Sequence, residues 1–320
     1  MTASKNRLIL DTDGGVDDAQ ALLMLLANGR APDAITTVFG NVGLEAATRN
    51  ILTVLAVAGA DVPVHTGAGR PLTQAVIDAK HVHGEDGLGG APRPATIAPV
   101  AGNDAVGFLI ETFRNASHAG HKVDILMIGP LTNLALALRL HPSIINGIGR
   151  LTIMGGTVYG RGNSTPAAEF NIYADPEAAS IVFGADIDIV VAPWEPCVTH
   201  FMTQDQVEAL LAATPDSPQK AFSEALVRHA LETVAGYGGG YVFRFVDPLA
   251  AGAVIDPTII AKSIRASVDV ALAPGITRGM TVVDPSGRLG TPKVTLIEEV
   301  KVDRLIAFYS ASIAFAQPRN

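Results

Sequence analysis

LILDTDGGVDDA, residues 8–19, is an apolar run that leads directly into an acidic loop and then into an apolar segment with helical spacing. The first part predicts a buried strand over residues 7–10, and the segment behind the loop predicts a helix over 17–28. Four aspartates (Asp11, Asp13, Asp17 and Asp18) stand within eight residues where the strand gives way to the helix. The chain therefore begins with a strand, a carboxylate-rich loop and a helix.

The same alternation continues to about residue 200. Strands that alternate with helices over short connections favour an α/β fold, an open and mainly parallel sheet with helices on both faces. Right-handed crossovers then gather the functional loops at the carboxyl ends of the strands. The further predicted strands are 35–39, 62–65, 123–128, 151–154 and 187–191, and the further predicted helices are 45–58, 104–114, 131–140 and 176–183.

Beyond residue 200 the pattern changes but the domain continues. Helices are predicted at 204–213, 219–234 and 302–315, and β-like segments at 267–273 and 280–283. No Pro/Ser linker, charge run or internal repeat separates this part from the rest. We therefore expect one domain over residues 1–320, in which residues from about 200 to 320 complete the wall of the active site.

Composition excludes several classes of protein. The chain has 320 residues, of which 48% are hydrophobic and 17% charged, enough apolar surface for a core and too much for a disordered chain. Its net charge of -8, without a basic block, argues against nucleic acid or an anionic membrane as a partner. Cys197 is the one cysteine, which excludes a disulfide framework. An N-terminus without an apolar core of signal-peptide length predicts a cytoplasmic location.

The aspartates of the first loop need a chemical explanation. Two of them fit a helix N-terminus, but four carboxylates this close repel one another unless protons or a cation neutralise them. Oxygen ligands in this density indicate a hard cation, Ca²⁺ or Mg²⁺. An EF-hand counted from Asp11 fails, because it would place Gly15, Val16 and Leu22 at loop positions 5, 6 and 12.

A phosphatase is one alternative for this loop. The strand followed by Asp-x-Asp-Gly resembles the haloacid dehalogenase family, which would make Asp11 the nucleophile and Asp13 the acid/base. That family also needs a downstream lysine and an acidic pair behind a later strand. Neither Gly-Asp-x-x-x-Asp nor Asp-Asp follows a later predicted strand, and Asp17 and Asp18 would have no role.

A second family accounts for more of the chain. Residues 13–19 resemble the Asp-x-Asp-Pro-Gly-x-Asp-Asp-Ala signature of the inosine/uridine-preferring nucleoside hydrolases. Further segments resemble this family in the same order, from about residue 8 to 250. They are VFGN (38–41), HGEDGLG (83–89), GPLTN (129–133), MGG (154–156), EFNIYADP (169–176) and DPL (247–249).

The resemblance implies a Rossmann-like fold and Ca²⁺-dependent hydrolysis of the N-glycosidic bond of a ribonucleoside, giving ribose and a free base. It also implies a homodimer or homotetramer. The implied Ca²⁺ ligands are Asp13, Asp18, Asp247 and the backbone carbonyl of Ile128, with Asp13 as general base. The implied substrate-binding residues are Asp17, Asn41 and Asn171 at the ribose 2′- and 3′-hydroxyls, Glu169 and Asn163 at the 5′-hydroxyl, Met154 against the sugar, and His83.

Two positions depart from the family pattern. Gly14 stands where proline is usual, and Val246 stands where many members carry a histidine that helps to protonate the departing base. Valine cannot donate a proton, so His83, His229, Arg244, a tyrosine or water remain candidates, and the preferred base stays open between purine, modified base and pyrimidine. A non-catalytic nucleoside- or ribose-binding protein is the remaining alternative, although it would have no need of a water-activating metal.

Overall fold

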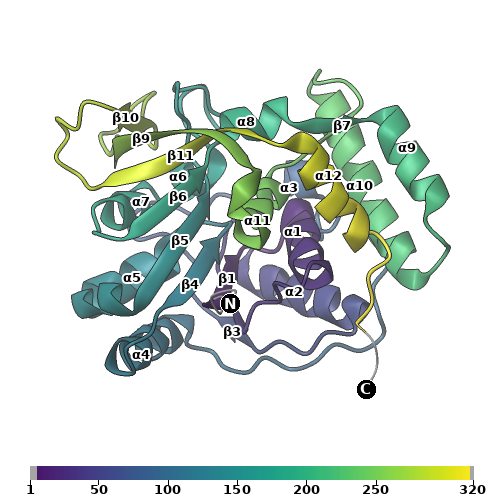
Figure 1. Cartoon of the computed structure of the whole chain (residues 1–320), viewed down its shortest axis with the longest axis horizontal. Helices are drawn as coiled ribbons and strands as arrows, with labels where there is room; N and C mark the ends of the chain where they lie inside the picture. The colour runs from purple at the N-terminus through teal and green to yellow at the C-terminus, as the bar shows by residue number, and fades with distance from the viewer. Residues whose placement is uncertain (1–5, 318–320) are drawn as a thin grey trace.

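The computed structural model describes residues 6–317, and its centre is a nine-stranded sheet (Figure 1). The strand order is β10-β9-β11-β6-β5-β4-β1-β2-β3, and β9 alone runs antiparallel to its neighbours. The strands are β1 (Arg7–Thr12), β2 (Ala34–Thr37), β3 (Val64–Thr66), β4 (Val123–Met127), β5 (Ile148–Met154), β6 (Asp188–Ala192), β9 (Ile260–Val270), β10 (Thr281–Asp284) and β11 (Lys293–Val300), with β7 (Phe201–Thr203) and β8 (Val242–Arg244) forming a separate antiparallel pair.

Helices cover both faces of the sheet, which confirms the predicted α/β fold class. In Figure 1, α4, α5 and α7 lie on one side, and α1, α2, α10, α11 and α12 lie on the other. The longer helices are α1 (Val16–Ala27), α2 (Leu44–Ala58), α4 (Ala105–His118), α5 (Thr132–Leu140), α7 (Pro176–Phe183), α9 (Gln204–Ala213), α10 (Pro218–Gly236), α11 (Asp247–Ile255) and α12 (Val302–Ser312). The short ones are α3 (Lys80–His83), α6 (Phe170–Ala174) and α8 (Trp194–Thr199), with 3₁₀ turns at Pro142–Gly147 and Pro257–Ile259.

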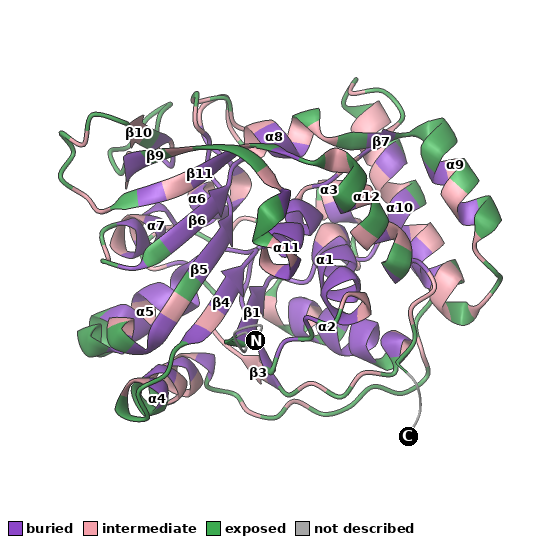
Figure 2. Ribbon diagram, in the orientation of Figure 1, coloured by how far each residue is buried: buried purple, intermediate pink, exposed green. Residues whose placement is uncertain are grey.

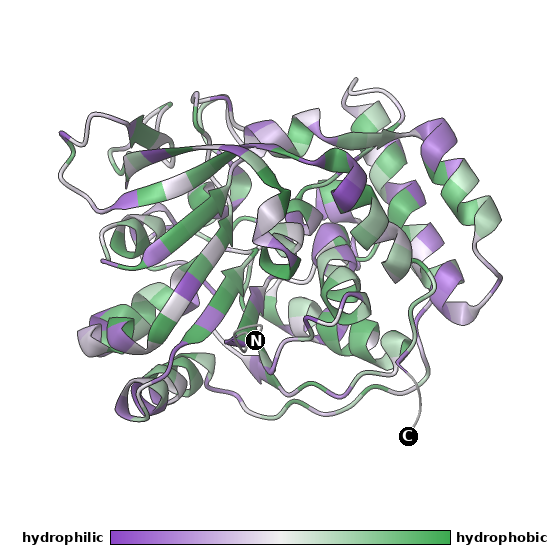
Figure 3. Ribbon diagram, viewed as in Figure 1, coloured by the Kyte–Doolittle hydropathy of each residue, from purple (hydrophilic) through white to green (hydrophobic). Residues whose placement is uncertain are grey.

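The central strands are apolar throughout because each buries both faces. In β1, Leu8 and Leu10 pack into the core beneath α1 and α11, whereas Ile9 points into the core beneath α4, α5 and α7. This is the alternation that a pleated strand imposes. Figures 2 and 3 show the result, a central sheet that is both buried and hydrophobic. None of the helices in residues 6–317 is long and apolar enough to cross a membrane.

The strand order locates a binding site before any side chain is considered. Strands β3-β2-β1-β4-β5-β6 have the doubly wound order, and the direction in which successive strands are added to the sheet reverses between β1 and β4. In such sheets ligands bind outside the carboxyl ends of the strands at this reversal. Asp13 follows β1 there, and Ile128 follows β4.

The C-terminal third differs most from the sequence-based expectation. The predicted helices at 204–213, 219–234 and 302–315 are present within two or three residues, but β11 and α11 were not predicted. β11 pairs in parallel with β6 and antiparallel with β9, so it joins the last strands to the main sheet. The single domain over 1–320 stays a prediction, which this shared sheet supports.

An aromatic cluster fixes the segment between β8 and α11. Phe243 stacks on Tyr309 of α12 with ring centroids 4.6 Å apart, and Phe245 meets the same ring edge-on at 5.6 Å. All three side chains are buried. The Tyr309 hydroxyl has no hydrogen-bond partner within the described part of the chain. Its ring therefore stabilises the packing while its hydroxyl opposes burial.

We expect Tyr309→Phe to leave the free energy of unfolding unchanged or to raise it by up to about 1 kcal/mol, because an unpaired buried hydroxyl is removed. Tyr309→Ala should lower it by about 3–5 kcal/mol through loss of ring packing. Urea unfolding followed by circular dichroism measures both. A loss above about 1 kcal/mol in the phenylalanine variant would show that the hydroxyl has a partner.

Candidate active site

A cavity of about 450 Å³ opens at the reversal point of the sheet. Its volume falls in the range usual for small-molecule sites. Most residues that the sequence singled out line it, although they come from distant parts of the chain. They are Asp17, Asn41, His83, Ile128, Met154, Asn163, Glu169, Asn171 and Asp247. Asp13 and Asp18 are fully buried and do not line it.

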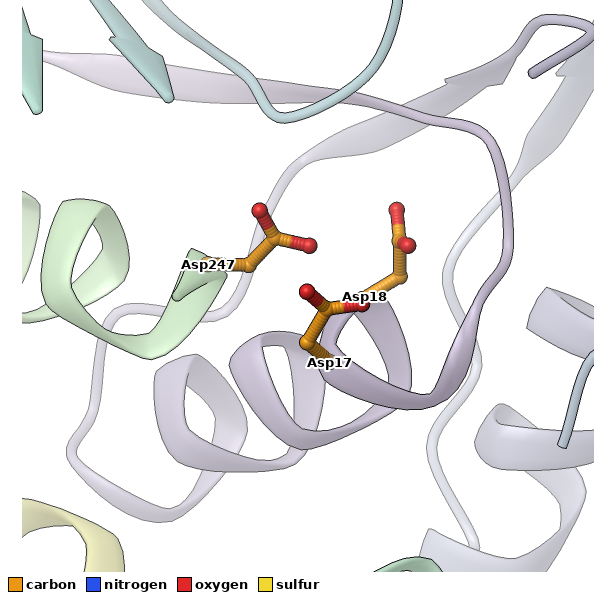
Figure 4. Close-up of side chains that lie close together, drawn as sticks. All are labelled: Asp17, Asp18 and Asp247. Atoms are coloured by element: carbon orange, nitrogen blue, oxygen red, sulfur yellow. The ribbon is translucent and has the colours of Figure 1, made fainter. Parts of the chain in front are cut away.

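Three carboxylates converge, and those of Asp17 and Asp247 line the cavity (Figure 4). Asp17 and Asp18 stand in the first turn of α1, and Asp247 begins α11. One oxygen of each lies within 4.8 Å of the others. Two oxygens bound to the same Ca²⁺ at 2.3–2.6 Å are at most about 5 Å apart, so this spacing fits a shared cation. A basic residue, His83, lies beside the three, with its Nδ1 3.6 Å from Asp17 Oδ1.

Asp13 lies beside this group and is joined to it through Asn41. The Asn41 backbone N–H donates to Asp13 Oδ2 at 2.7 Å. Asn41 Nδ2 donates both to Asp13 Oδ1, at 3.0 Å, and to Asp18 Oδ2, at 2.9 Å. Asp18 also accepts from the Gly15 N–H and from the Thr12 hydroxyl. The resemblance placed Asp13 with Asp18 and Asp247, whereas Asp17 completes the converging group of three.

Glycines let the backbone approach these carboxylates. A Cβ on Gly40 would lie 2.0 Å from Asp13 Oδ2, so any side chain there would displace the carboxylate. Gly14 has φ of 67°, and a Cβ there would lie 2.6 Å from the Ala47 backbone. Proline, fixed near -65°, cannot adopt this conformation, so the departure at position 14 has a backbone basis.

Amide and carboxylate groups occupy the wall formed by β4, β5 and α6. Asn171 Nδ2 donates to the carbonyls of Ile128 and Met154, each at 3.1 Å, which leaves its Oδ1 available. Glu169 caps α6 by accepting the N–H groups of Asn171 and Ile172, and it also accepts the Gly156 N–H at 2.9 Å. Glu169 is therefore held in place by the backbone around it.

Asn163 stands at the edge of the same wall. Its Oδ1 accepts the Phe170 N–H at 2.8 Å, and the residue is exposed. Its amide N–H groups are the part that remains available to a ligand.

His83 is held as a neutral ring. Its Nδ1 accepts the N–H of Val16, the first residue of α1, at 3.1 Å. An accepting Nδ1 leaves the proton on Nε2. Burial, the main cause, and the neighbouring His229 and His81 lower the pKa of His83 to about 4, although Asp18 opposes the shift. At neutral pH the contact with Asp17 is therefore not an ion pair.

Burial without a cation raises the pKa values of the acidic residues. The pKa of Asp17 rises to about 6 and that of Glu169 to about 7, in both cases chiefly through burial. Burial and repulsion from neighbouring carboxylates also raise the pKa values of Asp13, Asp18 and Asp247. The group therefore takes up either protons or a cation.

The opposite wall of the cavity consists mainly of residues from α3, α10 and β8. The sequence named His229, Arg244 and a tyrosine as candidates, and His229, Arg244 and Tyr237 line the cavity. Phe243 belongs to the aromatic cluster, and Tyr241 lies outside the cavity. Trp194 also lines the cavity. Nothing in the local sequence around Trp194 indicated this, because its position depends on the turn after β6.

Comparison with known proteins points to one family. Residues 8–307 match the family model described as "Inosine-uridine preferring nucleoside hydrolase". The enzyme of that name from Leishmania major is 37% identical over 290 residues, 87% of each chain. The pyrimidine-specific ribonucleoside hydrolase of Salmonella dublin is 38% identical over 302 residues, 93% of this chain and 94% of its own. A solved inosine-guanosine nucleoside hydrolase has a TM-score of 0.87 at 27% identity, covering 98% of this chain and 100% of its own.

The raised pKa values predict how stability depends on pH. Glu169 ionises near pH 7 in the folded chain and near its usual 4.5 when unfolded, and Asp11 follows the same pattern. Between these values the folded state binds more protons, so stability falls as pH rises. His83 has the opposite effect only below its unfolded pKa of 6.5. In a chelator we therefore expect the melting temperature to fall between about pH 6.5 and 8.5.

Calcium should reverse this trend, because ionised carboxylates bind it best. At about one hundred times its dissociation constant, Ca²⁺ adds roughly 2.7 kcal/mol. Differential scanning calorimetry in EDTA and in CaCl₂ at the two pH values measures both effects. Glu169→Gln should reduce the slope in EDTA. A melting temperature that rises with pH in EDTA would contradict the prediction.

Proposed function

We propose that this chain, which belongs to the inosine-uridine preferring nucleoside hydrolase family, cleaves the N-glycosidic bond of ribonucleosides to give ribose and a free base. Family membership supports the reaction class. The observation that carries the proposal is the carboxylate group at the reversal of the sheet, where Asp17, Asp18 and Asp247 converge beside Asp13 in a small-molecule cavity. Such a site suits a neutral substrate rich in hydroxyl groups.

We assign Ca²⁺ to Asp13, Asp18, Asp247 and the Ile128 carbonyl. When bound, the ion supplies a positive charge that lowers the pKa of water. Asp13 serves as the base that takes the proton from the attacking water. Asn41 supports this role because its two N–H donors fix both oxygens of the Asp13 carboxylate. The Ile128 carbonyl keeps a second lone pair beside its bond from Asn171.

The ribose lies between Asp17 and the wall opposite α10. Asp17 Oδ1 is buried and makes no hydrogen bond within residues 6–317, so it can accept a hydrogen bond from a sugar hydroxyl. Asn41 and Asn171 assist at the 2′- and 3′-hydroxyls. Glu169 and Asn163 bind the 5′-hydroxyl, with Met154 against the ring. Acidic groups at both ends disfavour a 5′-phosphate, and loss of the 2′-hydroxyl leaves a buried acceptor unpaired.

A phosphatase fits the geometry less well. Asp11, which would be its nucleophile, does not line the cavity. Its Oδ2 accepts from Thr36 at 2.5 Å and from Asn133 at 2.8 Å. Burial raises the pKa of Asp11 to about 7, so at neutral pH a large share of this group is protonated and cannot act as the nucleophile. The acidic cavity would also repel a phosphate ester. A non-catalytic binding protein would not require the Asp13 and Asn41 arrangement.

For assembly and location we propose a cytoplasmic homodimer or homotetramer. This rests on the family resemblance.

The reaction is tested by incubating the protein with a panel of ribonucleosides in CaCl₂ or EDTA and measuring free base by chromatography. We expect release that EDTA suppresses, that Asp13→Ala lowers by at least about a hundredfold, and that 2′-deoxynucleosides support poorly. Asp61→Ala, an exposed residue outside the cavity, is the matched control. Phosphate release from a phosphate ester, lost in Asp11→Asn, would favour the phosphatase instead.

A calorimetric titration with Ca²⁺ distinguishes the aspartates assigned to the metal from Asp17, which is assigned to the sugar. Asp18→Asn and Asp247→Asn should weaken Ca²⁺ binding at least about tenfold, because each removes a charged ligand. Asp17→Asn should bind Ca²⁺ within about threefold of wild type but lose turnover. If Asp17→Asn loses Ca²⁺ as Asp18→Asn does, Asp17 is a metal ligand, and its assignment to the sugar is wrong.

A further inference from the structure

The cavity has two chemically different walls. One wall carries the carboxylates and amides assigned to the sugar. The other carries mainly apolar and aromatic side chains, together with histidines of α3 and α10 and a single arginine. Its residues include Val82, Val234, Tyr237, Arg244 and Val246. A flat heterocyclic base suits this second wall, so Arg244 is the permanent positive charge beside the base.

Backbone alternation directs Arg244 into the cavity. It ends β8, and the chain continues through Phe245 and Val246 to Asp247 at the start of α11. Phe243 and Phe245 are fully buried in the aromatic cluster. Arg244 and Val246, on the alternate positions, both line the cavity. Since the aromatic cluster fixes one side of this segment, it fixes the direction of the other.

Arg244 is unusual among the arginines that are not exposed, because its charge is not paired. In residues 6–317, three arginines are not exposed: Arg30, Arg244 and Arg278. Arg30 pairs with Asp124 at 3.3 Å and Arg278 with Glu177 at 2.8 Å. The Arg244 side chain forms no ion pair or hydrogen bond within the described residues, and its Nε is buried without a partner. Half-buried guanidinium groups normally have acceptors, so an acceptor is missing here.

A glycine-rich turn leaves room for the guanidinium group. A Cβ on Gly239 would lie 2.7 Å from Arg244 Nη2. The Arg244 side chain therefore packs against the backbone of the turn that follows α10.

The histidines of the cavity are already committed to other contacts. His229 Nε2 lies 2.8 Å from the Val82 carbonyl, to which only a protonated Nε2 can donate, and its ring packs against Gly89. His83 Nδ1 accepts from the Val16 N–H. Tyr237 is 64% exposed. Arg244 is a free, permanently charged donor. It is therefore better suited than any of these groups to replace the histidine that is absent at position 246.

We propose that Arg244 stabilises the departing base by donating N–H hydrogen bonds to it as the base takes up negative charge. This inference rests on the proposed ribosidase function. A fixed positive charge at the base wall then stabilises the leaving group. No proton is transferred to the base from Arg244, because a guanidinium group does not give up its proton.

The step balances without another reactant. The water oxygen forms a bond to C1′ and gives a proton to Asp13, while the C1′–N bond breaks and its electron pair stays on the base. Arg244 holds the resulting anion. The base then takes a proton from solvent as it leaves, and Asp13 returns its proton to solvent.

This arrangement selects a class of base. Anions of oxo bases, such as hypoxanthine and uracil, spread their charge onto a carbonyl oxygen, which a planar guanidinium can bind together with a ring nitrogen. Adenine offers no carbonyl oxygen. Ribonucleosides with an oxo base are therefore the substrates that depend most on Arg244.

The test compares two ribosides that differ in their need for leaving-group stabilisation. Nitrophenolate leaves readily, whereas hypoxanthine does not. We expect Arg244→Met to lower kcat on inosine by about 10- to 100-fold, and to lower it at least about tenfold less on 4-nitrophenyl riboside. Arg244→Lys, which keeps the charge, should recover part of the loss on inosine. Arg114→Met, exposed on α4, is the matched control for loss of an arginine.

Each outcome either supports or overturns the proposed role of Arg244. Equal losses on both ribosides in Arg244→Met, or no loss on either, would overturn the leaving-group role. A lowered melting temperature with equal losses would make Arg244 structural. If the wild-type protein hydrolyses neither riboside, the ribosidase function itself fails, and the role of Arg244 fails with it. Turnover of 4-nitrophenyl riboside by wild type separates the two proposals.

Discussion

Mutual repulsion among buried carboxylates is the constraint on which this structure depends. Asp13, Asp17, Asp18 and Asp247 share one region, and the positive end of α1 offsets only part of their charge. A helix N-terminus contributes at most about 2 kcal/mol, whereas burying several charges costs far more. The Asn41 and Gly15 donors orient the oxygens without neutralising them. The loop is thus built to be completed by a cation or by protons.

That constraint explains the local geometry around β1 and β2. Carboxylates that must point inward need backbone donors close by, so the neighbouring chain approaches more closely than a side chain allows. Gly40 beside Asp13 and Gly14 beside Ala47 are the two places where this is most evident. The parallel sheet supplies the rest, because it brings the ends of β1 and β4 together at the reversal of the strand order.

The sequence predicted the helices and strands that a local pattern of residues encodes. β1 and α1 were predictable because apolar runs and helical spacing lie within a few residues of each other. β11 was missed because its Glu298 and Glu299 interrupt the apolar run. The proximity of Asp247 to α1 came only from the family resemblance, since no local signal relates residues 230 positions apart. The place of Trp194 in the cavity, likewise, depends on tertiary packing after β6.

The two walls of the cavity are coupled through one short segment. Arg244 and Asp247 are three residues apart, which limits their Cα separation to about 10 Å. That span places a permanent positive charge at the proposed base wall and a carboxylate at the proposed cation site on one piece of backbone. The ring of Tyr309 holds this piece by packing on Phe243 and Phe245, outside the cavity. Because a guanidinium stays charged across the whole range in which a histidine titrates, the proposed role of Arg244 does not require a titrating histidine at position 246.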